Sequence, residues 1–337
     1  MKAIIQDGYG SIDVLRLDDV DPPPLGDDEV LVRVHAASVH PDVWHMVRGL
    51  PYVLRIMGGG LRRPNRRVPG TDMAGRIEAV GPRVTRFQVG DDVFGETVKL
   101  HQWTNGGAYA EYVAVKESKL ARKPANVSYA EAAAVPTSGL IALRSLREQG
   151  RLQAGQAVLI NGAAGGVGSL ALQIAKAFGA VVTGVDSTDK LDLMRSLGAD
   201  HVIDYTQDDF TQRPERYDLI VDVPGNHSLA ACRRALTRDG TYVLVAHDQF
   251  GEKGHLWLGS LPRMLGLLAL TPFVRHLRSP KATVDTTTTP LEVLSELLAS
   301  GKLTPMIDRT YPLSGVLDAM NRLTSGDARG KIILSCR

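Results

Sequence analysis

The sequence has few cysteines, few aromatic side chains and no marked excess of either charge. Its 337 residues include two cysteines, Cys232 and Cys336, too few for a disulfide framework or a cysteine-rich zinc site. The 39 basic and 37 acidic side chains give a net charge of +2, which favours neither nucleic acid nor an acidic membrane surface as a partner. The first ten residues lack the apolar core of a secretion signal, so we expect a cytoplasmic protein.

Long hydrophobic runs are also scarce, with one exception at residues 256–274. A membrane-spanning helix needs roughly 20 predominantly apolar residues with few charges. This stretch contains Pro262, Arg263 and Pro272, and Arg275 follows it. We therefore predict a bent, buried helix that lines a pocket or an interface, with membrane contact as the alternative, and we expect no membrane partner.

The length predicts two domains, and the sequence pattern changes near residue 157. The first third is rich in β-forming residues, and "EVLVRVHAASV", "AGRIEAVG" and "AYAEYVAV" read as strands between proline- and glycine-rich turns. From residue 157, short apolar strands alternate with helical segments, which predicts a parallel sheet covered on both faces. Gly179, Gly198 and Gly240 are expected to end helices. Two further helices, "PLEVLSELLASG" and "LSGVLDAMNRLTSG", and a strand, "GKIILS", are expected near the C-terminus.

A glycine cluster lies between the first strand and the first helix of this alternating series. It comprises Gly162, Gly165, Gly166 and Gly168, and an acidic residue, Asp186, ends the next strand. Glycines allow the strand to turn and a pyrophosphate to approach the backbone, and the helix N-terminus offers free N–H groups. A carboxylate after the second strand can accept hydrogen bonds from ribose hydroxyls. The combination predicts a dinucleotide-binding site.

The whole chain resembles the medium-chain dehydrogenase/reductase superfamily, and within it the zinc-independent quinone oxidoreductase-like branch. The resemblance rests on "GAAGGVG", "SLGADHVIDYT", "VPGTDMAGRIEAVG", "FQVGDDVFG", "GGAYAEYVAV", "EAAAVPTSGLIAL" and "ARGKIIL", in the family's order. It implies an α/β protein in which a Rossmann domain, a doubly wound parallel sheet at residues 124–285, is inserted into a β-rich GroES-like catalytic domain at residues 1–123 and 286–337. The active site would lie in the cleft between them. The family also implies a homodimer formed through the edge of the Rossmann sheet.

The same resemblance bears on zinc, because zinc-dependent relatives use Cys, His and Cys with a nearby Glu. The corresponding positions here are His40, Thr71 and a position near Ala134, with Asp72 as the acidic neighbour. A catalytic zinc needs three protein ligands, so we expect no metal. The zinc-free branch usually carries Asn where this chain has His40. The family resemblance therefore does not specify which polar groups line the pocket.

Without a Lewis acid, hydride donation from NAD(P)H to a quinone or an α,β-unsaturated carbonyl is the favoured reaction on a small-molecule substrate. The alternatives are an alcohol or ketone dehydrogenase and a nicotinamide-binding redox sensor without turnover. Candidate catalytic residues are His40, Trp44 and Tyr52, although Trp44 fits a core position equally well and Tyr52 fits a loop anchor. Cofactor contacts are expected from Thr137, Gly162, Gly165, Gly166, Val167, Gly168, Asp186, Ser187, Lys190, Tyr205, Ala246 and Lys331.

The choice between the two nicotinamide cofactors depends on Asp186 and Lys190. A carboxylate that accepts from both ribose hydroxyls would repel a 2′-phosphate, so the sequence favours NADH. In the alternative, Asp186 turns away, and Lys190 with Ser187 and Thr188 holds the 2′-phosphate of NADPH.

Overall fold

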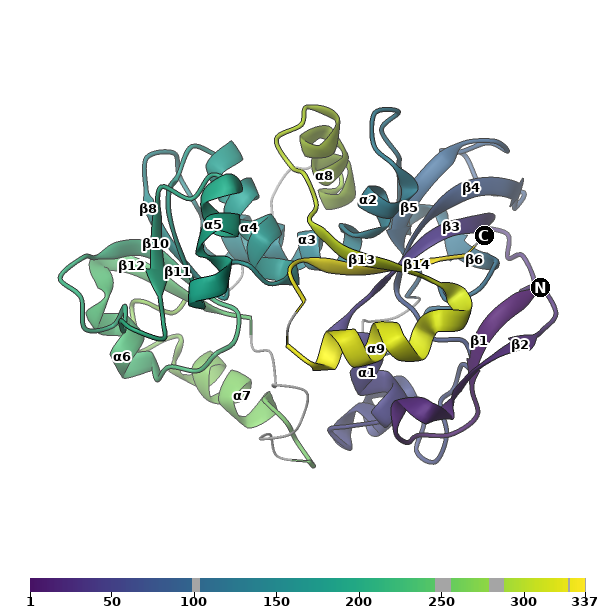
Figure 1. The fold of residues 1–337 in the computed structure, drawn as a ribbon, viewed down its shortest axis with the longest axis horizontal. Helices are drawn as coiled ribbons and strands as arrows, with labels where there is room; N and C mark the ends of the chain where they lie inside the picture. Colours follow the sequence, from purple (N-terminus) through teal and green to yellow (C-terminus); the bar gives the residue numbers. More distant parts are fainter. Residues whose placement is uncertain (99–103, 246–255, 279–287, 327, 337) are drawn as a thin grey trace.

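The computed structural model describes residues 1–98, 104–245, 256–278, 288–326 and 328–336. The chain forms two lobes, and both ends of the sequence lie in the same one (Figure 1). The right-hand lobe combines the N-terminal strands with the last strands and α9, and the left-hand lobe holds the middle of the sequence. This arrangement is the one expected for a domain inserted into another. The boundaries at residues 123/124 and 285/286 stay a prediction.

The first lobe is built on a mixed sheet organised by one long strand, β3 (Glu29–Val39). One end of β3 pairs with β6 and the other with β14, and β4 pairs along most of its length. The sheet thus joins residues from both ends of the chain, as the resemblance implies. Its order is β13-β14-β3-β4-β5-β7, and β1 and β2 form a separate hairpin. The other bounds are β1 (Lys2–Gln6), β2 (Leu15–Asp19), β4 (Asp72–Val80), β5 (Asp92–Glu96), β6 (Tyr112–Lys116), β7 (Leu120–Arg122), β13 (Ile307–Pro312) and β14 (Lys331–Ser335).

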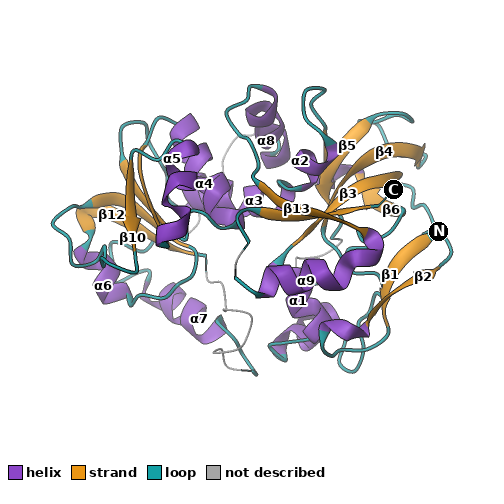
Figure 2. Ribbon diagram, in the orientation of Figure 1, coloured by secondary structure: helices purple, strands orange, loops and turns teal. Residues whose placement is uncertain are grey.

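The second lobe contains a five-stranded parallel sheet in the order β10-β9-β8-β11-β12. Side chains of the central strand alternate between two cores: Val158 and Ile160 face one apolar cluster and Leu159 faces another. Helices therefore cover both faces of this sheet, and the prediction of a doubly wound Rossmann domain is confirmed (Figure 2). The strands are β8 (Ala157–Asn161), β9 (Val181–Asp186), β10 (His201–Asp204), β11 (Tyr217–Asp222) and β12 (Leu236–Leu244).

The helices have recognisable start and stop signals. Capping boxes begin α2 and α8, and Gly179 and Gly198 take positive φ values just beyond the ends of α4 and α5. Among the residues described, no helix combines the length and apolar character needed to cross a bilayer. The helices are α1 (Pro41–Arg48), α2 (Tyr129–Ala133), α3 (Pro136–Arg144), α4 (Gly166–Ala177), α5 (Leu191–Ser196), α6 (Leu229–Arg234), α7 (Leu261–Leu270), α8 (Pro290–Ala299) and α9 (Val316–Thr324).

Two sequence-based expectations are wrong. Residues 261–270 do form a helix, α7, but none of its residues is buried. Only one side of the helix packs on the second lobe, and the other side faces outward. Gly240 lies inside β12 and ends no helix, since α6 already ends at Arg234. Strand β13 was not predicted from the sequence, because "IDRTYP" lacks a clear apolar alternation.

Candidate functional site

The glycine cluster forms the turn between β8 and α4. Gly162 has φ +79°, a left-handed conformation that favours glycine. A Cβ on Gly168 would lie 2.0 Å from the Gly162 carbonyl oxygen, so helix and turn can pack this closely only without a side chain. Gly165 is the N-cap of α4 and brings no side chain to cap it. The N-terminus of α4 is thus open to an anion, as a pyrophosphate cradle requires.

A cleft of about 310 Å³ opens in front of this turn, between the two lobes. The second lobe contributes Gly165, Gly166 and Val167, and the first lobe contributes His40, Asp42 and Lys331. The Lys331 ammonium group is buried and donates a hydrogen bond to Ser138 Oγ at 3.0 Å. Burial lowers the pKa of Lys331, while Asp72 and Asp42 oppose this shift. The cleft therefore brings a cationic side chain beside the phosphate cradle.

His40 precedes the N-terminus of α1 and is the N-cap of this helix. Its Nδ1 accepts the backbone N–H of Asp42 at 3.2 Å, and Asp42 Oδ2 lies 3.3 Å from the same nitrogen. Two groups of Asp42 thus contact Nδ1, one a donor and the other an acceptor. Nε2 is therefore the ring nitrogen that this side chain can offer within the cleft.

Beneath the cleft, a buried polar network surrounds the positions that match zinc ligands in the relatives. Asp72 accepts from Ser38 Oγ at 3.1 Å and from the Thr137 hydroxyl and backbone N–H. Thr137 Oγ1 also lies 3.0 Å from Glu96, whose pKa is raised first by burial and then by the Asp72 charge. The Asp72 carboxylate is thus satisfied by protein donors.

These residues do not fit a catalytic zinc. Thr71 presents a buried hydroxyl with no hydrogen-bond partner, which is a weak replacement for the imidazole that the metal would need there. Ala134 offers no ligand atom and packs in the apolar core. Within the described ranges, no three His, Cys, Asp or Glu side chains come close enough to hold a metal ion.

At the end of β9, Asp186 is held by the protein itself. Its Oδ2 accepts the backbone N–H of Ala164 at 2.9 Å, and its Oδ1 accepts that of Ser187 at 3.0 Å. Lys190 Nζ lies 3.6 Å from Oδ1. The carboxylate therefore supports the glycine turn, and its charge is offset by a lysine.

A second, polar cavity lies beside Lys190, and we call it the ribose-end pocket. Its charged side chains are Lys190, Arg322, Arg329 and Asp189, and Ser187, Tyr205 and Gly326 complete it. Arg329 pairs with Asp189 at 3.3 Å, and Arg322 pairs with Asp308 at 2.9 Å. Lys190 and Gly326 line both this pocket and the cleft, so the two cavities adjoin. Arg322 and Arg329 were not predicted from the sequence, since they follow Lys190 by more than a hundred residues.

The structure brings some of the predicted residues together and separates others. The cleft is lined by six of them: His40, Gly165, Gly166, Val167, Lys190 and Lys331. Three others support the glycine turn without lining the cleft: Gly162, Gly168 and Asp186. Trp44 is 7% exposed within the core of the first lobe, which fits the core position that the sequence leaves open for it. Tyr52 does not line the cleft; its ring packs on Trp257 as a loop anchor. Thr137 lies in the polar network, and Ala246 lies outside the described residues.

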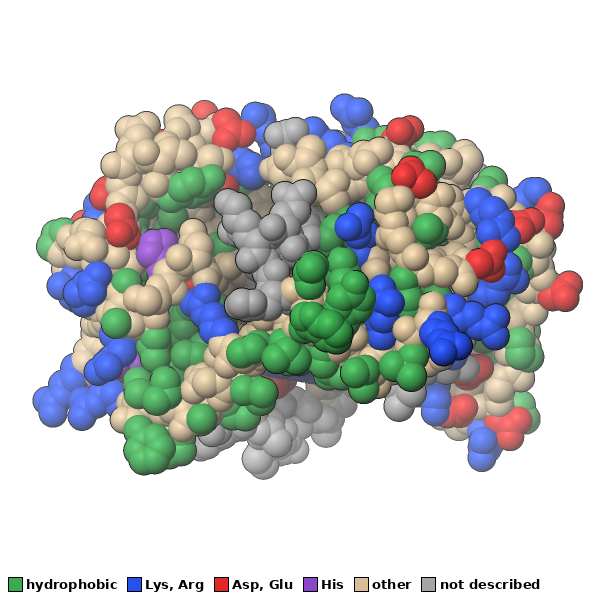
Figure 3. Space-filling model, turned by 90° about the horizontal axis from the view of Figure 1, so that it is seen from below, with side chains coloured by type: hydrophobic (Ala, Val, Ile, Leu, Met, Phe, Trp, Pro, Cys, Tyr) green, Lys and Arg blue, Asp and Glu red, His purple; other side chains and the backbone are tan. Residues whose placement is uncertain are grey.

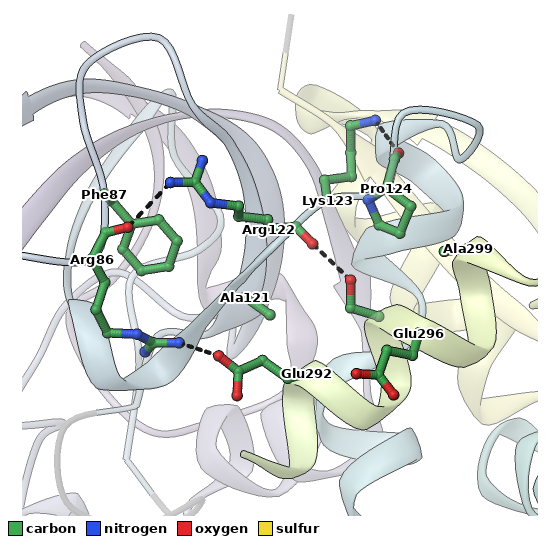
Figure 4. A pocket seen from close by; sticks show the side chains of 10 residues that line it. Arg86, Phe87, Ala121, Arg122, Lys123, Pro124, Glu292, Glu296 and Ala299 are labelled. Atoms are coloured by element: carbon green, nitrogen blue, oxygen red, sulfur yellow. Dashed lines mark hydrogen bonds and ion pairs between the residues drawn. The ribbon is translucent and has the colours of Figure 1, made fainter. Parts of the chain in front are cut away.

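Another hollow lies between β7 and α8, where side chains of α8 contact the first lobe (Figure 4). Arg86 pairs with Glu292 at 2.7 Å, and Ser295 Oγ donates to the Arg122 carbonyl oxygen at 2.8 Å. These contacts fasten α8 to the first lobe.

A nucleotide cradle, a cleft between a GroES-like and a Rossmann domain, and a buried lysine define a dinucleotide-dependent dehydrogenase or reductase. Two family models match the chain: "Alcohol dehydrogenase GroES-like domain" at residues 26–125 and "Zinc-binding dehydrogenase" at residues 197–334. The chain belongs to the medium-chain dehydrogenase/reductase superfamily, in its quinone oxidoreductase-like branch.

Relatives cover nearly the whole chain. The 2-methylene-furan-3-one reductase of Solanum lycopersicum is 34% identical over 99% of this chain and 79% of its own length. The chloroplastic NADPH-dependent alkenal/one oxidoreductase of Arabidopsis thaliana is 33% identical over the same shares. Among solved structures, the quinone oxidoreductase of Coxiella burnetii has a TM-score of 0.79 at 27% identity, covering 100% of this chain and 99% of that one.

Proposed function

We propose that this protein transfers hydride from NAD(P)H to a quinone or an α,β-unsaturated carbonyl, without a metal. The observation that carries the proposal is the continuous path from the ribose-end pocket, past the glycine turn, to His40 in the cleft. The path has a phosphate cradle in the middle and a hydrogen-bond donor at one end. The names of the tomato and Arabidopsis relatives, which specify reduction of enones and alkenals, support the same reaction.

The residues of the cleft have complementary tasks in this reaction. When bound, the reduced nicotinamide supplies the hydride. The N-terminus of α4 and Lys331 bind the pyrophosphate, because helix N–H groups and an ammonium group both favour negative charge. His40 donates its Nε2–H to the oxygen of the acceptor, where negative charge develops as the hydride arrives. The surrounding apolar residues, including Val223, Val245 and Ile332, limit the access of water.

A turnover screen with purified protein tests the proposal. NADPH and NADH would each be combined with a quinone, an enal, a saturated ketone and, for the reverse reaction, a secondary alcohol with the oxidised cofactor. We expect reduction of quinone or enal at rates well above those with ketone or alcohol. Efficient alcohol oxidation alone would support the dehydrogenase alternative, and cofactor binding without any turnover would support the redox sensor.

The first prediction concerns zinc. We expect purified protein to contain less than a stoichiometric amount of zinc and to keep its activity in a chelator, because Thr71 and Ala134 replace two ligands and Asp72 is already hydrogen-bonded. Elemental analysis and assays with and without a chelator measure both quantities. One tightly bound zinc per chain, with activity lost on its removal, would contradict the prediction.

We propose NADPH as the preferred cofactor, in place of the NADH that the sequence favours. Asp186 uses both carboxylate oxygens on backbone N–H groups and has Lys190 beside it, so its repulsion of a phosphate is reduced. The ribose-end pocket adds Arg322 and Arg329, so basic side chains outnumber acidic ones in its lining. We propose that the 2′-phosphate of NADPH binds in this pocket, where Lys190 and Arg329 supply charge-assisted hydrogen bonds.

The second prediction tests that preference. Lys190→Ala is expected to lower kcat/KM for NADPH by about tenfold or more while changing the value for NADH much less, which corresponds to ~1.4 kcal/mol or more of lost binding. Lys176→Ala, which removes a half-buried lysine paired with Asp200, is the matched control. A wild type that prefers NADH, together with an Asp186→Ser variant whose preference moves toward NADPH, would restore the NADH assignment.

The third prediction concerns assembly. The sequence-based expectation of a homodimer formed through the Rossmann sheet edge stays a prediction, and we propose it at β12, which lies at one edge of the sheet among the described strands. The backbone N–H of Tyr242 in β12 already donates to the His276 carbonyl oxygen at 2.8 Å, so this N–H group is not available to pair with a partner strand. Sedimentation equilibrium at micromolar concentration is expected to give a dimer, and a monomer would contradict it. A cytoplasmic location also stays a prediction.

A further inference from the structure

One face of the molecule exposes an unusual number of large apolar side chains. Ile56 is 74% exposed, Trp257 72%, Leu265 61% and Phe273 83%. Figure 3 shows this face, with hydrophobic side chains gathered across it and Lys and Arg side chains beside them. We call it the apolar–basic surface, and its exposed apolar members are Ile56, Met57, Leu61, Trp257, Leu265, Leu268 and Phe273.

The surface is formed by two chain segments that the structure joins directly. Tyr52 N–H donates to the Leu256 carbonyl oxygen at 2.8 Å, and Val53 N–H donates to that of Trp257 at 3.0 Å. The rings of Tyr52 and Trp257 lie 5.1 Å apart. Residues 52–63 of the first lobe and residues 256–273 of the second therefore form one continuous surface. Scattered apolar side chains need no explanation, but a contiguous exposed patch marks an interaction site.

The two segments that form the apolar–basic surface carry positive charges only. Residues 43–71 and 256–278 together contain nine arginines and neither aspartate nor glutamate. Asp7 and Asp239, from outside the segments, pair with Arg67 and Arg275. In the part of the chain that the structure describes, no carboxylate pairs with Arg62, Arg63 or Arg66. The near-neutral net charge of the whole protein thus conceals a local excess of positive charge.

We propose that the apolar–basic surface binds the surface of an anionic phospholipid bilayer without spanning it. Apolar side chains beside arginines match the acyl boundary and the phosphate groups of such a bilayer. A second copy of this chain is a poorer partner, because both sides of a two-fold contact would carry the same excess of arginines and neither segment has a carboxylate to pair with them. Nucleic acid offers phosphates but leaves most of the exposed leucines and Phe273 without an apolar partner.

The surface reaches the edge of the candidate active site. Met264 of α7 is partly exposed beside Leu265 and also lines the cleft together with Ser260. If the proposed reaction is correct, an apolar acceptor dissolved in the bilayer would meet the cleft at this edge. The binding itself does not depend on that reaction, and the following test reads binding without any turnover.

Sedimentation with sucrose-loaded vesicles tests the proposal. Full-length protein would be mixed with vesicles of phosphatidylcholine containing about one third phosphatidylglycerol, or with phosphatidylcholine alone, near physiological salt. We expect binding to the anionic vesicles at least about tenfold tighter than to the neutral ones, because basic residues near an anionic bilayer surface are attracted to it. Arg62→Gln/Arg63→Gln and Leu265→Ser/Phe273→Ser should each weaken binding by about tenfold.

Matched variants control for charge and for apolar exposure. Arg83→Gln/Arg122→Gln removes two exposed arginines outside the surface, and Val89→Ser/Val181→Ser removes two exposed apolar side chains outside it. Both should bind as the wild type does, and circular dichroism should show that all variants are folded. The proposal is overturned if the wild type stays in the supernatant, if the controls lose as much binding, or if neutral vesicles bind equally well.

Two further outcomes would assign the surface to other partners and also overturn the proposal. If Leu265→Ser/Phe273→Ser dissociates a dimer while no vesicle binding is seen, a second copy covers the surface. If duplex DNA binds more tightly than anionic vesicles, and only the arginine variant reduces that binding, the partner is a nucleic acid. A failure of the turnover screen with intact vesicle binding would leave this inference standing and refute only the proposed reaction.

Discussion

Replacing Gly168 with alanine is expected to weaken NADPH binding by about 100-fold or more, a loss of ~2.7 kcal/mol or more. The added Cβ would lie 2.0 Å from the Gly162 carbonyl oxygen and 2.8 Å from Ala163 Cα, both of them backbone atoms. The turn or the start of α4 must therefore shift, and with it the N–H groups that hold the pyrophosphate. A fluorescence titration with NADPH measures the change in affinity.

Two other glycines make this prediction specific. Gly266→Ala places a methyl group in open space within α7 and should leave cofactor affinity unchanged, with stability equal or raised by ~0.5–1 kcal/mol. Gly166→Ala brings Cβ within 3.3 Å of Lys331 Cδ, a side-chain atom that must give by only a few tenths of an ångström, and should cause a smaller loss than Gly168→Ala. A folded Gly168→Ala protein with wild-type affinity would show that this turn does not hold the cofactor.

The second large effect is expected at His40. His40→Ala removes both the cap of α1 and the Nε2–H donor, and it should lower kcat with an enal by about 100-fold, which is typical of one lost oxyanion donor. His40→Asn should recover most of that loss. Its Oδ1 can accept the Asp42 N–H while its amide group donates to the acceptor, so both tasks are kept.

The loss of the cap must be separated from the loss of the donor. Ser128→Ala removes the cap of α2, and we expect it to cost ~1 kcal/mol of stability, as His40→Ala should, without the fall in kcat. An unchanged kcat in His40→Ala would remove this residue from the reaction. Equal losses in His40→Ala and His40→Asn would mean that the imidazole acts through proton transfer and not through a hydrogen bond.

The sequence predicts the Rossmann lobe well because its signals are local. Alternating apolar strands, the glycine turn and Asp186 follow one another within thirty residues, and each imposes a conformation on its own neighbourhood. The β-rich lobe required the family resemblance. No local pattern shows that β14, from the C-terminus, pairs with β3, from the N-terminus.

The site was predicted less completely because several of its contacts join distant residues. Lys331 reaches Ser138, and Arg329 joins Lys190 in the ribose-end pocket, across separations that a sequence does not encode locally. Asp186 was identified correctly as the acid after the second strand, but its hydrogen bond to Ala164 depends on the folded turn. The exposure of α7 was missed because an apolar sequence does not distinguish a buried helix from one that faces outward.

The central claim is hydride transfer to the β-carbon of an unsaturated carbonyl compound, and isotope transfer tests it most directly. NADPH deuterated at C4 of the nicotinamide, prepared as each stereoisomer, would be incubated with the protein and an enal, and the product analysed by mass spectrometry and NMR. We predict that one of the two stereoisomers places a single deuterium on the β-carbon of a saturated aldehyde. Deuterium on the carbonyl carbon of an allylic alcohol, or cofactor binding with neither a labelled product nor reduction of a quinone, would contradict the account.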